Sequence, residues 1–201
     1  LVALKIIDNL EFPIFKYILS SNTYYLLFLV ASLIVSIFWV TGVTNALNWT
    51  DGLDGLAGGV SLIILSGLFF IFLSLGLNNY ALYSITIAGG CYGFLIHNTK
   101  PASIHMGDGG SYFLGFNLAT LSLIASNNLF IESNLNNSLF TSFFPIIILS
   151  VPIFDMVFVI LLRLLNFKSP FYPDRNHLHH RLLSLGFSYQ NTILIILILN
   201  I

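Results

Sequence analysis

Charged side chains are scarce in this sequence: Asp, Glu, Lys and Arg make up only 7% of its 201 residues. A soluble domain has about 25%. Hydrophobic residues account for 57%, and the mean hydropathy is +0.91. This composition excludes an ordinary soluble domain and indicates an integral membrane protein.

Cysteine and net charge are also nearly absent. The single cysteine, Cys91, excludes an internal disulfide and a CxxC metal site. The net charge of -1 gives no basis for a nucleic-acid partner, and none is expected. No basic segment precedes an apolar core and a small-residue cleavage site, so no cleavable signal peptide is predicted.

Long apolar runs are abundant, and they predict an all-α fold, a polytopic transmembrane helical bundle. Pro145 and Pro152 predict kinks in the last full span. Residues 1–201 are expected to form a single integral membrane domain. Because apolar runs stop short at both ends, we expect a truncated part of a longer protein. The five full spans are predicted at 24–40, 60–77, 80–96, 112–131 and 143–165, with partial spans at 1–7 and 193–201.

The polar connections between these spans predict a topology. Segments 41–59, 97–111 and 166–190 fall on one side, and segments 1–23, 78–79 and 132–140 fall on the other. The first side carries Lys100, Lys168, Arg175 and Arg181, and the second only Lys5 and Lys16. The positive-inside rule makes the first side cytoplasmic. Every cluster of Asp and His falls on that side.

The first such cluster contains Asp51 and Asp54, in the segment Asn45-Ala-Leu-Asn48-Trp-Thr-Asp51-Gly-Leu-Asp54-Gly. If the segment continues a helix, the two carboxylates share a face, as do Asn45 and Asn48. They could then bind a divalent metal or a metal-bound phosphate, or share a proton. The structural alternative is that Asp caps a helix starting near Leu56.

A second cluster is the glycine-rich segment Met106-Gly-Asp108-Gly-Gly-Ser111, which enters the fourth span. Such a turn suits phosphate oxygens, and a carboxylate within it suits Mg²⁺, which prefers one or two carboxylates plus substrate phosphates. A plain turn capped by Asp108 or Ser111 is the alternative.

The third cluster is basic and runs from Asp174-Arg175 through His177, His179 and His180 to Arg181. On a helix, His177, His180 and Arg181 share a face. Histidine and arginine beside a Mg²⁺ site favour an anionic diphosphate over zinc, for which no cysteine or HExxH partner exists. Contact with lipid head groups is the alternative.

Two charges fall within or at the end of the fifth span. Asp155 is costly inside a membrane helix, which favours a function, although bonding to a neighbouring helix explains it equally well. Arg163 is predicted to snorkel to the interface.

Together these motifs resemble the polyprenyl-phosphate N-acetylhexosamine-1-phosphate transferases of glycosyltransferase family 4. The HxHH form is similar to the WecA/TagO-like branch, because the phospho-MurNAc-pentapeptide translocase branch has three consecutive histidines and Leu178 interrupts them here. The matching residues are Asn45-Ala-x-Asn48-x-x-Asp51-Gly-x-Asp54-Gly-Leu, Pro101-Ala-x-x-x-Met-Gly-Asp108-x-Gly-Ser111-x-x-Leu-Gly115, Val151-Pro-x-x-Asp155 and Ser169-Pro-Phe-x-x-Asp174-Arg175-x-His177-x-His179-His180-Arg181-Leu.

The resemblance implies roles for these residues. Asp108 is implied as the ligand of Mg²⁺, with Mn²⁺ as an alternative metal. Asp51, Asp54, Asp108 and His177 are implied as catalytic, and the substrate-binding residues are Asn45, Asn48, Asp174, Arg175, His179, His180 and Arg181.

The implied reaction is the first step of lipid-linked cell-surface glycan synthesis, such as cell-wall or lipopolysaccharide synthesis. GlcNAc-1-phosphate moves from a UDP-N-acetylhexosamine to polyprenyl (undecaprenyl) phosphate, and UMP leaves. The implied setting is the cytoplasmic face of a bacterial inner membrane, and a homodimer is compatible with it. The family also has a catalytic Asp pair on an earlier loop. None precedes Asn45, so we expect this segment alone to be inactive.

Three alternatives remain open. One is the phospho-MurNAc-pentapeptide transferase of peptidoglycan synthesis. The second is a membrane phosphatase acting on polyprenyl diphosphates, which has no need of the Asn-x-x-Asn-x-x-Asp array. The third is a cation transporter with an intramembrane Asp and His relay, although most acids here fall at one membrane face.

Overall fold

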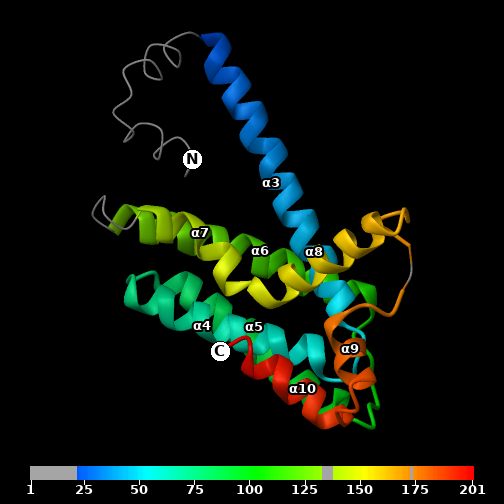
Figure 1. Ribbon diagram of the computed structural model, residues 1–201. Helices are drawn as coiled ribbons and strands as arrows, with labels where there is room; N and C mark the ends of the chain where they lie inside the picture. Colours follow the sequence, from blue (N-terminus) through cyan, green and yellow to red (C-terminus); the bar gives the residue numbers. More distant parts are fainter. Residues whose placement is uncertain (1–21, 133–137, 173) are drawn as a thin grey trace.

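The computed structural model describes residues 22–132, 138–172 and 174–201, and these ranges contain helices and loops but no strand. The predicted all-α bundle is confirmed (Figure 1). The partial span predicted at 1–7 lies outside the described residues. The helices are α3 (Asn22–Thr50), α4 (Leu56–Ser74), α5 (Asn78–Asn98), α6 (Gly107–Glu132), α7 (Ser138–Ile148), α8 (Ser150–Leu165), α9 (Leu178–Ser184) and α10 (Tyr189–Ile198).

Three of the described helices are long and apolar enough to cross a membrane: α3 from Leu26, α4, and α6 as far as Ile131. The bent pair α7 and α8 makes a fourth if it counts as one span. The predicted span at 80–96 is present as the 21-residue helix α5, but its Asn, Ser, Thr and Gly residues make it less apolar than the other three. The chain is therefore a multi-pass membrane protein with fewer clear spans than the five predicted.

The fifth predicted span is broken at Leu149, where the axes of α7 and α8 differ by 76°. Pro145 lies inside α7 and Pro152 in the first turn of α8. Pro152 has no N–H to donate to the carbonyl of Ile148, so the helical hydrogen-bond ladder cannot continue across the break. The predicted kink is confirmed, and it directs α8 onto α3.

The core of the bundle surrounds α4, which packs against α5, α6 and α10. Leu65, Leu68 and Phe72 on this helix are completely buried. Burying a side chain of this kind typically stabilises a fold by about 1.5–3 kcal/mol in water. In a bilayer, close packing contributes more than removal from water, so small residues at contacts matter.

Gly115 allows α6 to lie directly against α3. A Cβ atom at this position would lie 2.7 Å from the Cα atom of Thr44. One helical turn toward the loops, which is later in α3 and earlier in α6, Asn48 of α3 lies beside Ser111 of α6. The glycine thus sets the register between the two helices that carry the first two polar motifs.

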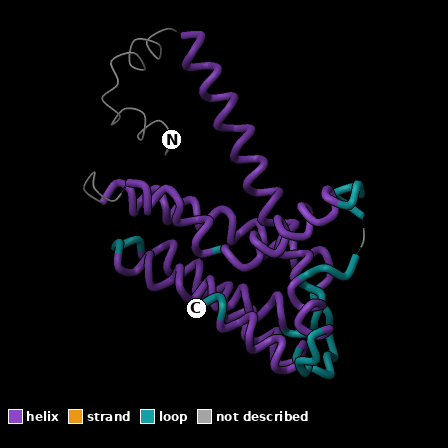
Figure 2. Tube along the Cα trace, viewed as in Figure 1, coloured by secondary structure: helices purple, strands orange, loops and turns teal. Residues whose placement is uncertain are grey.

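The polar segments gather at one end of the bundle, where most of the loops lie (Figure 2). The backbone N–H of Gly55, before α4, donates to the side-chain oxygen of Asn98 at the end of α5, with an N···O distance of 2.8 Å. The α4–α5 turn lies at the opposite end. The predicted grouping of segments 41–59, 97–111 and 166–190 on one side is confirmed.

Candidate active site

The first motif is mostly helical, because α3 continues to Thr50 instead of ending near Val40 as predicted. The helix accommodates polar side chains here because they bond to carbonyls one turn earlier: Thr44 Oγ1 donates to Val40 O at 2.6 Å, and Asn45 Nδ2 donates to Thr41 O at 2.8 Å. Asn45 is exposed, and this bond lies within its own helix.

Asp51 and Asp54 lie in the short turn between α3 and α4 and do not share a helical face. The structural alternative also fails, since Gly55 is the N-cap of α4 and no side chain caps that helix. Gly55 has a φ of 83°, a left-handed conformation that favours glycine. This residue closes the turn and presents the two acids at the end of the bundle.

Asn48 joins the first two motifs. Its Nδ2 donates to Asp108 Oδ1 at 3.0 Å and to Ser111 Oγ at 2.9 Å. Asp108 lies in the first turn of α6, which begins at Gly107 rather than near Tyr112 as predicted. A carboxylate in this position is stabilised by the positive end of the helix dipole. Sixty residues of sequence therefore separate two groups that are in direct contact.

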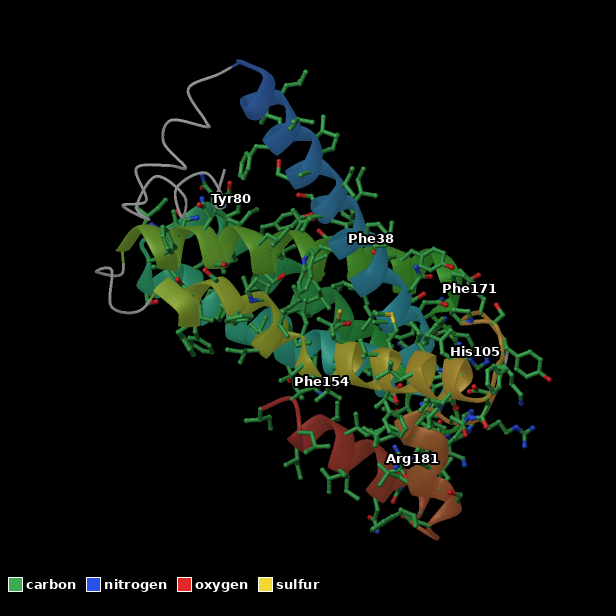
Figure 3. The ribbon with its side chains drawn as sticks, turned by 45° about the horizontal axis from the view of Figure 1, so that its top comes forward. Phe38, Tyr80, His105, Phe154, Phe171 and Arg181 are labelled. Carbon is green, nitrogen blue, oxygen red and sulfur yellow. The ribbon has the colours of Figure 1, made fainter. Side chains whose placement is uncertain are left out.

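The three acids lie within electrostatic reach of one another. The pKa of Asp51 is raised from 3.8 to about 6, chiefly because the carboxyl is partly buried. The positive charge available on His105 opposes this shift, while the negative charges of Asp54 and Asp108 add to it. His105 Nδ1 also lies 3.8 Å from Asp54 Oδ1, with the His105 side chain 77% exposed (Figure 3).

The acidic group formed by Asp51, Asp54 and Asp108 has the ligand chemistry of a shared metal site and not of a self-contained one. Within the described part of the chain, no three His, Cys, Asp or Glu residues lie close enough together to hold a metal ion by themselves. Mg²⁺, however, needs only one or two carboxylates when substrate phosphates and waters complete its shell. Asp108 is exposed, oriented by Asn48 and close to a second carboxylate. These residues fit a cation that binds together with a phosphate.

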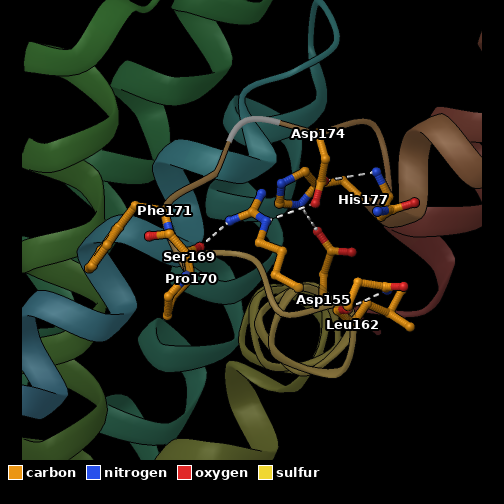
Figure 4. A network of polar contacts seen from close by, with 10 residues as sticks. Asp155, Leu162, Ser169, Pro170, Phe171, Asp174 and His177 are labelled. Atoms are coloured by element: carbon orange, nitrogen blue, oxygen red, sulfur yellow. Dashed lines mark hydrogen bonds and ion pairs between the residues drawn. The ribbon is translucent and has the colours of Figure 1, made fainter.

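The third motif is held to the bundle by Arg163 of α8, which is 4% exposed. Arg163 Nε donates to Asp174 Oδ2 at 2.8 Å, and Nη1 donates to the carbonyl of Pro170 (Figure 4). The guanidinium also lies over the ring of Trp49, 4.9 Å from its centroid. The prediction that Arg163 snorkels to the interface is wrong, because the loop after α8 folds back and supplies the partners that let the charge be buried.

The ion pair with Arg163 lowers the pKa of Asp174 and occupies its carboxylate. The hydrogen bond from Arg163 lowers the pKa of this carboxyl from 3.8 to about 2, and the Asn176 N–H donates to its other oxygen at 3.0 Å. Asp174 is therefore an anion engaged in shaping the loop. Its predicted substrate-binding role stays a prediction.

His177 lies between α8 and α3. Its Nδ1 is 2.9 Å from Asp155 Oδ2, and the edge of its ring meets Trp49 with the centroids 5.5 Å apart. The N–H of Leu178, the first residue of α9, donates to Asp155 Oδ1 at 2.6 Å. Asp155, for which the sequence left two interpretations open, thus contacts the histidine motif directly.

His179 links the histidine motif to the acidic turn. It is 3% exposed, stacks on His177 with centroids 5.8 Å apart, and fills the space beside Gly52. A Cβ atom on Gly52 would lie 2.3 Å from His179 Nε2. Burial, reinforced by His180 and His177, lowers the pKa of His179 to about 4, so the ring is neutral at pH 7.

The remaining basic residues lie at the periphery of this group. His180 is partly buried, and burial, together with the charges of His177 and Arg175, lowers its pKa. Arg175 and Arg181 are exposed. Arg181 lies over the ring of Phe158, with its Cζ 4.5 Å from the centroid. Arg175, just before α9, and Arg181, within it, thus place two positive charges beside the histidine motif.

An apolar groove of about 710 Å³ opens beside this cationic group, between α8, α9 and α10. Asp155 and Arg181 are the charged groups in its lining. The apolar wall includes Phe154, Phe158, Leu161 and Leu199. Its composition suits a hydrocarbon chain whose polar end reaches α9.

Two residues at this end of the bundle were missed by the sequence reasoning. Trp49 contacts both Arg163 and His177, and buried Asn98 accepts from Gly55 N and donates to Ile104 O at 2.8 Å. An amide at the end of an apolar span was the available signal for Asn98. Nothing in the sequence distinguished Trp49 from an interfacial aromatic residue.

Comparison of the sequence with known proteins shows the family of this chain. The sequence profile of glycosyl transferase family 4 matches residues 1–126. The chain belongs to glycosyl transferase family 4. The family match covers the acidic turn and Asp108, which Asn48 joins.

Relatives within this glycosyl transferase family include enzymes with different acceptor lipids or donors. The chain is 42% identical over 162 residues, 81% of its length, to the probable undecaprenyl-phosphate N-acetylglucosaminyl 1-phosphate transferase of Bacillus subtilis (strain 168). It is 34% identical over 83% of its length to the decaprenyl-phosphate N-acetylglucosaminephosphotransferase of Mycobacterium leprae (strain TN). The phospho-N-acetylmuramoyl-pentapeptide-transferase of Thermoanaerobacter sp. (strain X514) is 41% identical, but over 56% of the chain.

The chain matches less than half of each of these glycosyl transferase relatives: 43% of the Bacillus protein, 45% of the mycobacterial protein and 34% of the Thermoanaerobacter protein.

Proposed function

We propose that the protein carrying this chain transfers GlcNAc-1-phosphate from UDP-GlcNAc to a polyprenyl phosphate at the cytoplasmic membrane face. An oxygen of the lipid phosphate attacks the β-phosphorus of the nucleotide sugar. The bond from that phosphorus to the bridging oxygen breaks, and UMP leaves with the bridging oxygen. The products are UMP and a polyprenyl diphosphate sugar, so every phosphate is accounted for.

The observation that carries this proposal is the convergence of an acidic group and a cationic group at one end of the bundle. His179 packed on Gly52 joins them, and Asn48 ties Asp108 to the acidic side. A nucleotide diphosphate needs cations around its oxygens, and Arg175 and Arg181 are suited to supply them, while His180 can donate a hydrogen bond from a neutral ring. The adjacent apolar groove offers the lipid acceptor a lateral approach from the membrane.

The carboxylates have distinct parts in this proposal. Asp108 would hold Mg²⁺ or Mn²⁺, with Asp51 and Asp54 forming the neighbouring wall around the diphosphate. When bound, the cation would supply positive charge to the phosphoryl oxygens. Asn48 orients Asp108, because its amide bonds both the carboxylate and Ser111.

The decisive experiment follows radiolabelled sugar phosphate into lipid. The complete protein that carries this chain is reconstituted in nanodiscs with undecaprenyl phosphate, Mg²⁺ and UDP-GlcNAc labelled in the sugar. We expect labelled lipid and an equal amount of UMP. Asp108→Ala should abolish transfer even at saturating Mg²⁺. The matched control is Asn79→Ala, an exposed polar residue in the first turn of α5, at the opposite end of the bundle. Full transfer by Asp108→Ala would refute the metal assignment.

The same assay separates the competing functions. The likeness to phospho-N-acetylmuramoyl-pentapeptide-transferases makes UDP-MurNAc-pentapeptide the appropriate competing donor. If the protein prefers that donor, the transferred group in the proposal changes from GlcNAc-1-phosphate to phospho-MurNAc-pentapeptide. Release of inorganic phosphate from a polyprenyl diphosphate, without UMP, would indicate a phosphatase instead.

A further inference from the structure

Asp155 is a carboxylate inside an apolar helix whose two oxygens both serve the histidine motif. Its side chain is 10% exposed. Oδ2 lies 2.9 Å from His177 Nδ1, and Oδ1 accepts from the backbone N–H of Leu178 at 2.6 Å. A carboxylate inside a membrane helix is energetically costly unless hydrogen-bond partners compensate its charge. Here both partners belong to one short segment, residues 177–178.

We propose that Asp155 is a positioning residue that fixes the protonation and orientation of the His177 ring. An ionised carboxylate can only accept hydrogen bonds, so Nδ1 of His177 must carry the proton in the Asp155 contact. Nε2 is then the ring nitrogen left to meet a substrate oxygen. The effect on catalysis rests on the proposed transferase function, whereas the effect on the ring does not.

The surroundings of His177 support a fixed ring rather than a mobile one. Trp49 packs edge-on at a centroid distance of 5.5 Å, and His179 stacks nearly parallel, with an interplanar angle of 8°. The ring is thus held by two aromatic neighbours while Asp155 sets its rotation. A carboxylate that bonds one ring nitrogen of a histidine commonly fixes which nitrogen the ring presents to a reaction.

Asp155 also fixes where α9 begins. His177 is the residue preceding this seven-residue helix, and its own side chain makes no capping hydrogen bond. The carboxylate of Asp155 performs that role from another helix by accepting from Leu178 N. Figure 4 shows Asp155 of α8 beside His177. This one side chain therefore determines both the orientation of His177 and the path of the chain into α9, which carries His179 and His180.

The test is ¹⁵N NMR of the complete protein in nanodiscs, labelled at histidine, with His177→Gln used to assign the His177 signals. In the wild-type protein we expect Nδ1 of His177 to be protonated. In Asp155→Asn, the amide oxygen still accepts from Leu178, but the amide nitrogen donates to Nδ1. We therefore expect Nδ1 to lose its proton and Nε2 to gain one. An unprotonated Nδ1 in the wild-type protein, which needs no variant to observe, would overturn the proposal.

The matched control is Asp174→Asn, which removes a carboxylate from the same segment but one that bonds Arg163 instead of His177. It should leave Nδ1 of His177 protonated. A switch in both variants would mean that general loosening of the loop, and not the Asp155 contact, controls the ring.

Steady-state transfer assays then measure the consequence for catalysis. Asp155→Asn should lower kcat on the order of 100-fold, as expected for a misplaced reactive group, and leave KM for UDP-GlcNAc within about 3-fold. Unchanged kcat in a variant whose ring has switched would refute the positioning role in catalysis. If the wild-type protein transfers no sugar phosphate, the proposed function fails while the NMR result still decides the role of Asp155.

Discussion

The buried guanidinium of Arg163 and the carboxylate of Asp174 are 2.8 Å apart and hold the loop after α8 against the bundle. The Asp174 side chain is only 12% exposed. Removing one partner would leave the other charge buried without compensation, and this is strongly destabilising to the folded state. Trp49 beneath the guanidinium transmits this contact to α3.

The first prediction concerns loss of this pair. Asp174→Asn should lower the free energy of unfolding by about 3 kcal/mol, because Arg163 loses its charged partner in a buried position. The matched control is Lys168→Gln, an exposed cation on the same loop that lies over Tyr172, which should cost about 1 kcal/mol or less. Denaturant titration in detergent measures both. Equal small losses would mean that the pair does not anchor the loop.

A second prediction follows from the lowered pKa of Asp174. Hydrogen bonding from Arg163 lowers this pKa from 3.8 to about 2 in the folded protein. The unfolded chain therefore binds more protons between these values, and stability falls as the pH drops through them. The contribution, about 2 kcal/mol, should be complete above roughly pH 5 and lost toward pH 2.

The comparison for this pH effect is the difference in unfolding free energy between wild-type protein and Asp174→Asn, measured from pH 6 down to the lowest pH at which unfolding is reversible. That difference should shrink with acidification. Parallel curves for the two proteins would refute the assignment.

A third prediction tests the contact that joins the two motifs. Gly52→Ala places a Cβ atom 2.3 Å from His179 Nε2, and the buried ring has little room to move away. We expect a loss of about 1–3 kcal/mol from overpacking. His179→Ala should relieve the clash, so the double variant should show a favourable coupling energy.

Gly89→Ala serves as the matched glycine control. A Cβ atom there meets nothing within 4 Å, and the residue is exposed in α5. Its replacement should be neutral or stabilise by up to about 1 kcal/mol through helix propensity. Additive effects of Gly52→Ala and His179→Ala would show that the two residues are not in contact.

The fourth prediction concerns Asp51, whose pKa is raised to about 6 chiefly by burial. Here the folded state binds more protons than the unfolded state between about pH 4 and 6, so this group makes the protein less stable as the pH rises through that window. Asp51→Asn should therefore stabilise the protein at pH 7 by about 1–2 kcal/mol, after allowance for screening at a partly exposed turn.

Both proteins are compared at pH 4 and pH 7 in buffer without divalent cations. At pH 4 the wild-type carboxyl is largely protonated, and the two stabilities should converge. His105→Gln removes the opposing positive charge and should raise the titration midpoint of Asp51 further. A stability difference that does not change with pH would show that Asp51 titrates normally.

The sequence by itself determined the class of the protein and the location of its chemistry. Scarce charge and long apolar runs indicated membrane helices, because the backbone must satisfy its own hydrogen bonds in a bilayer. The two prolines in the fifth span indicated its break, because proline has no N–H to continue the helical hydrogen bonds. Counting spans placed Asp51, Asp108 and His177 at one end without any distance being known.

Only the tertiary structure decided which of these groups touch. Burial of Arg163 depends on Trp49, which approaches it from another helix, and on Pro170 and Asp174 in the loop that folds back after α8. The local sequence pattern does not encode these approaches. The end of α3 was missed for a local reason, since polar side chains near Thr44 bond back to their own helix and so did not mark a loop.

The role of Asp155 shows the division most clearly. From the sequence alone, Asp155 was a carboxylate that is energetically unfavourable in a membrane helix, and a functional role and a bond to a neighbouring helix explained it equally well. In the fold it lies beside His177, which is 22 positions away, and it accepts from the first N–H of α9. The sequence determines which groups are present and at which end of the bundle. Hydrogen-bond geometry, which is sensitive to fractions of an ångström, exists only once the helices have packed.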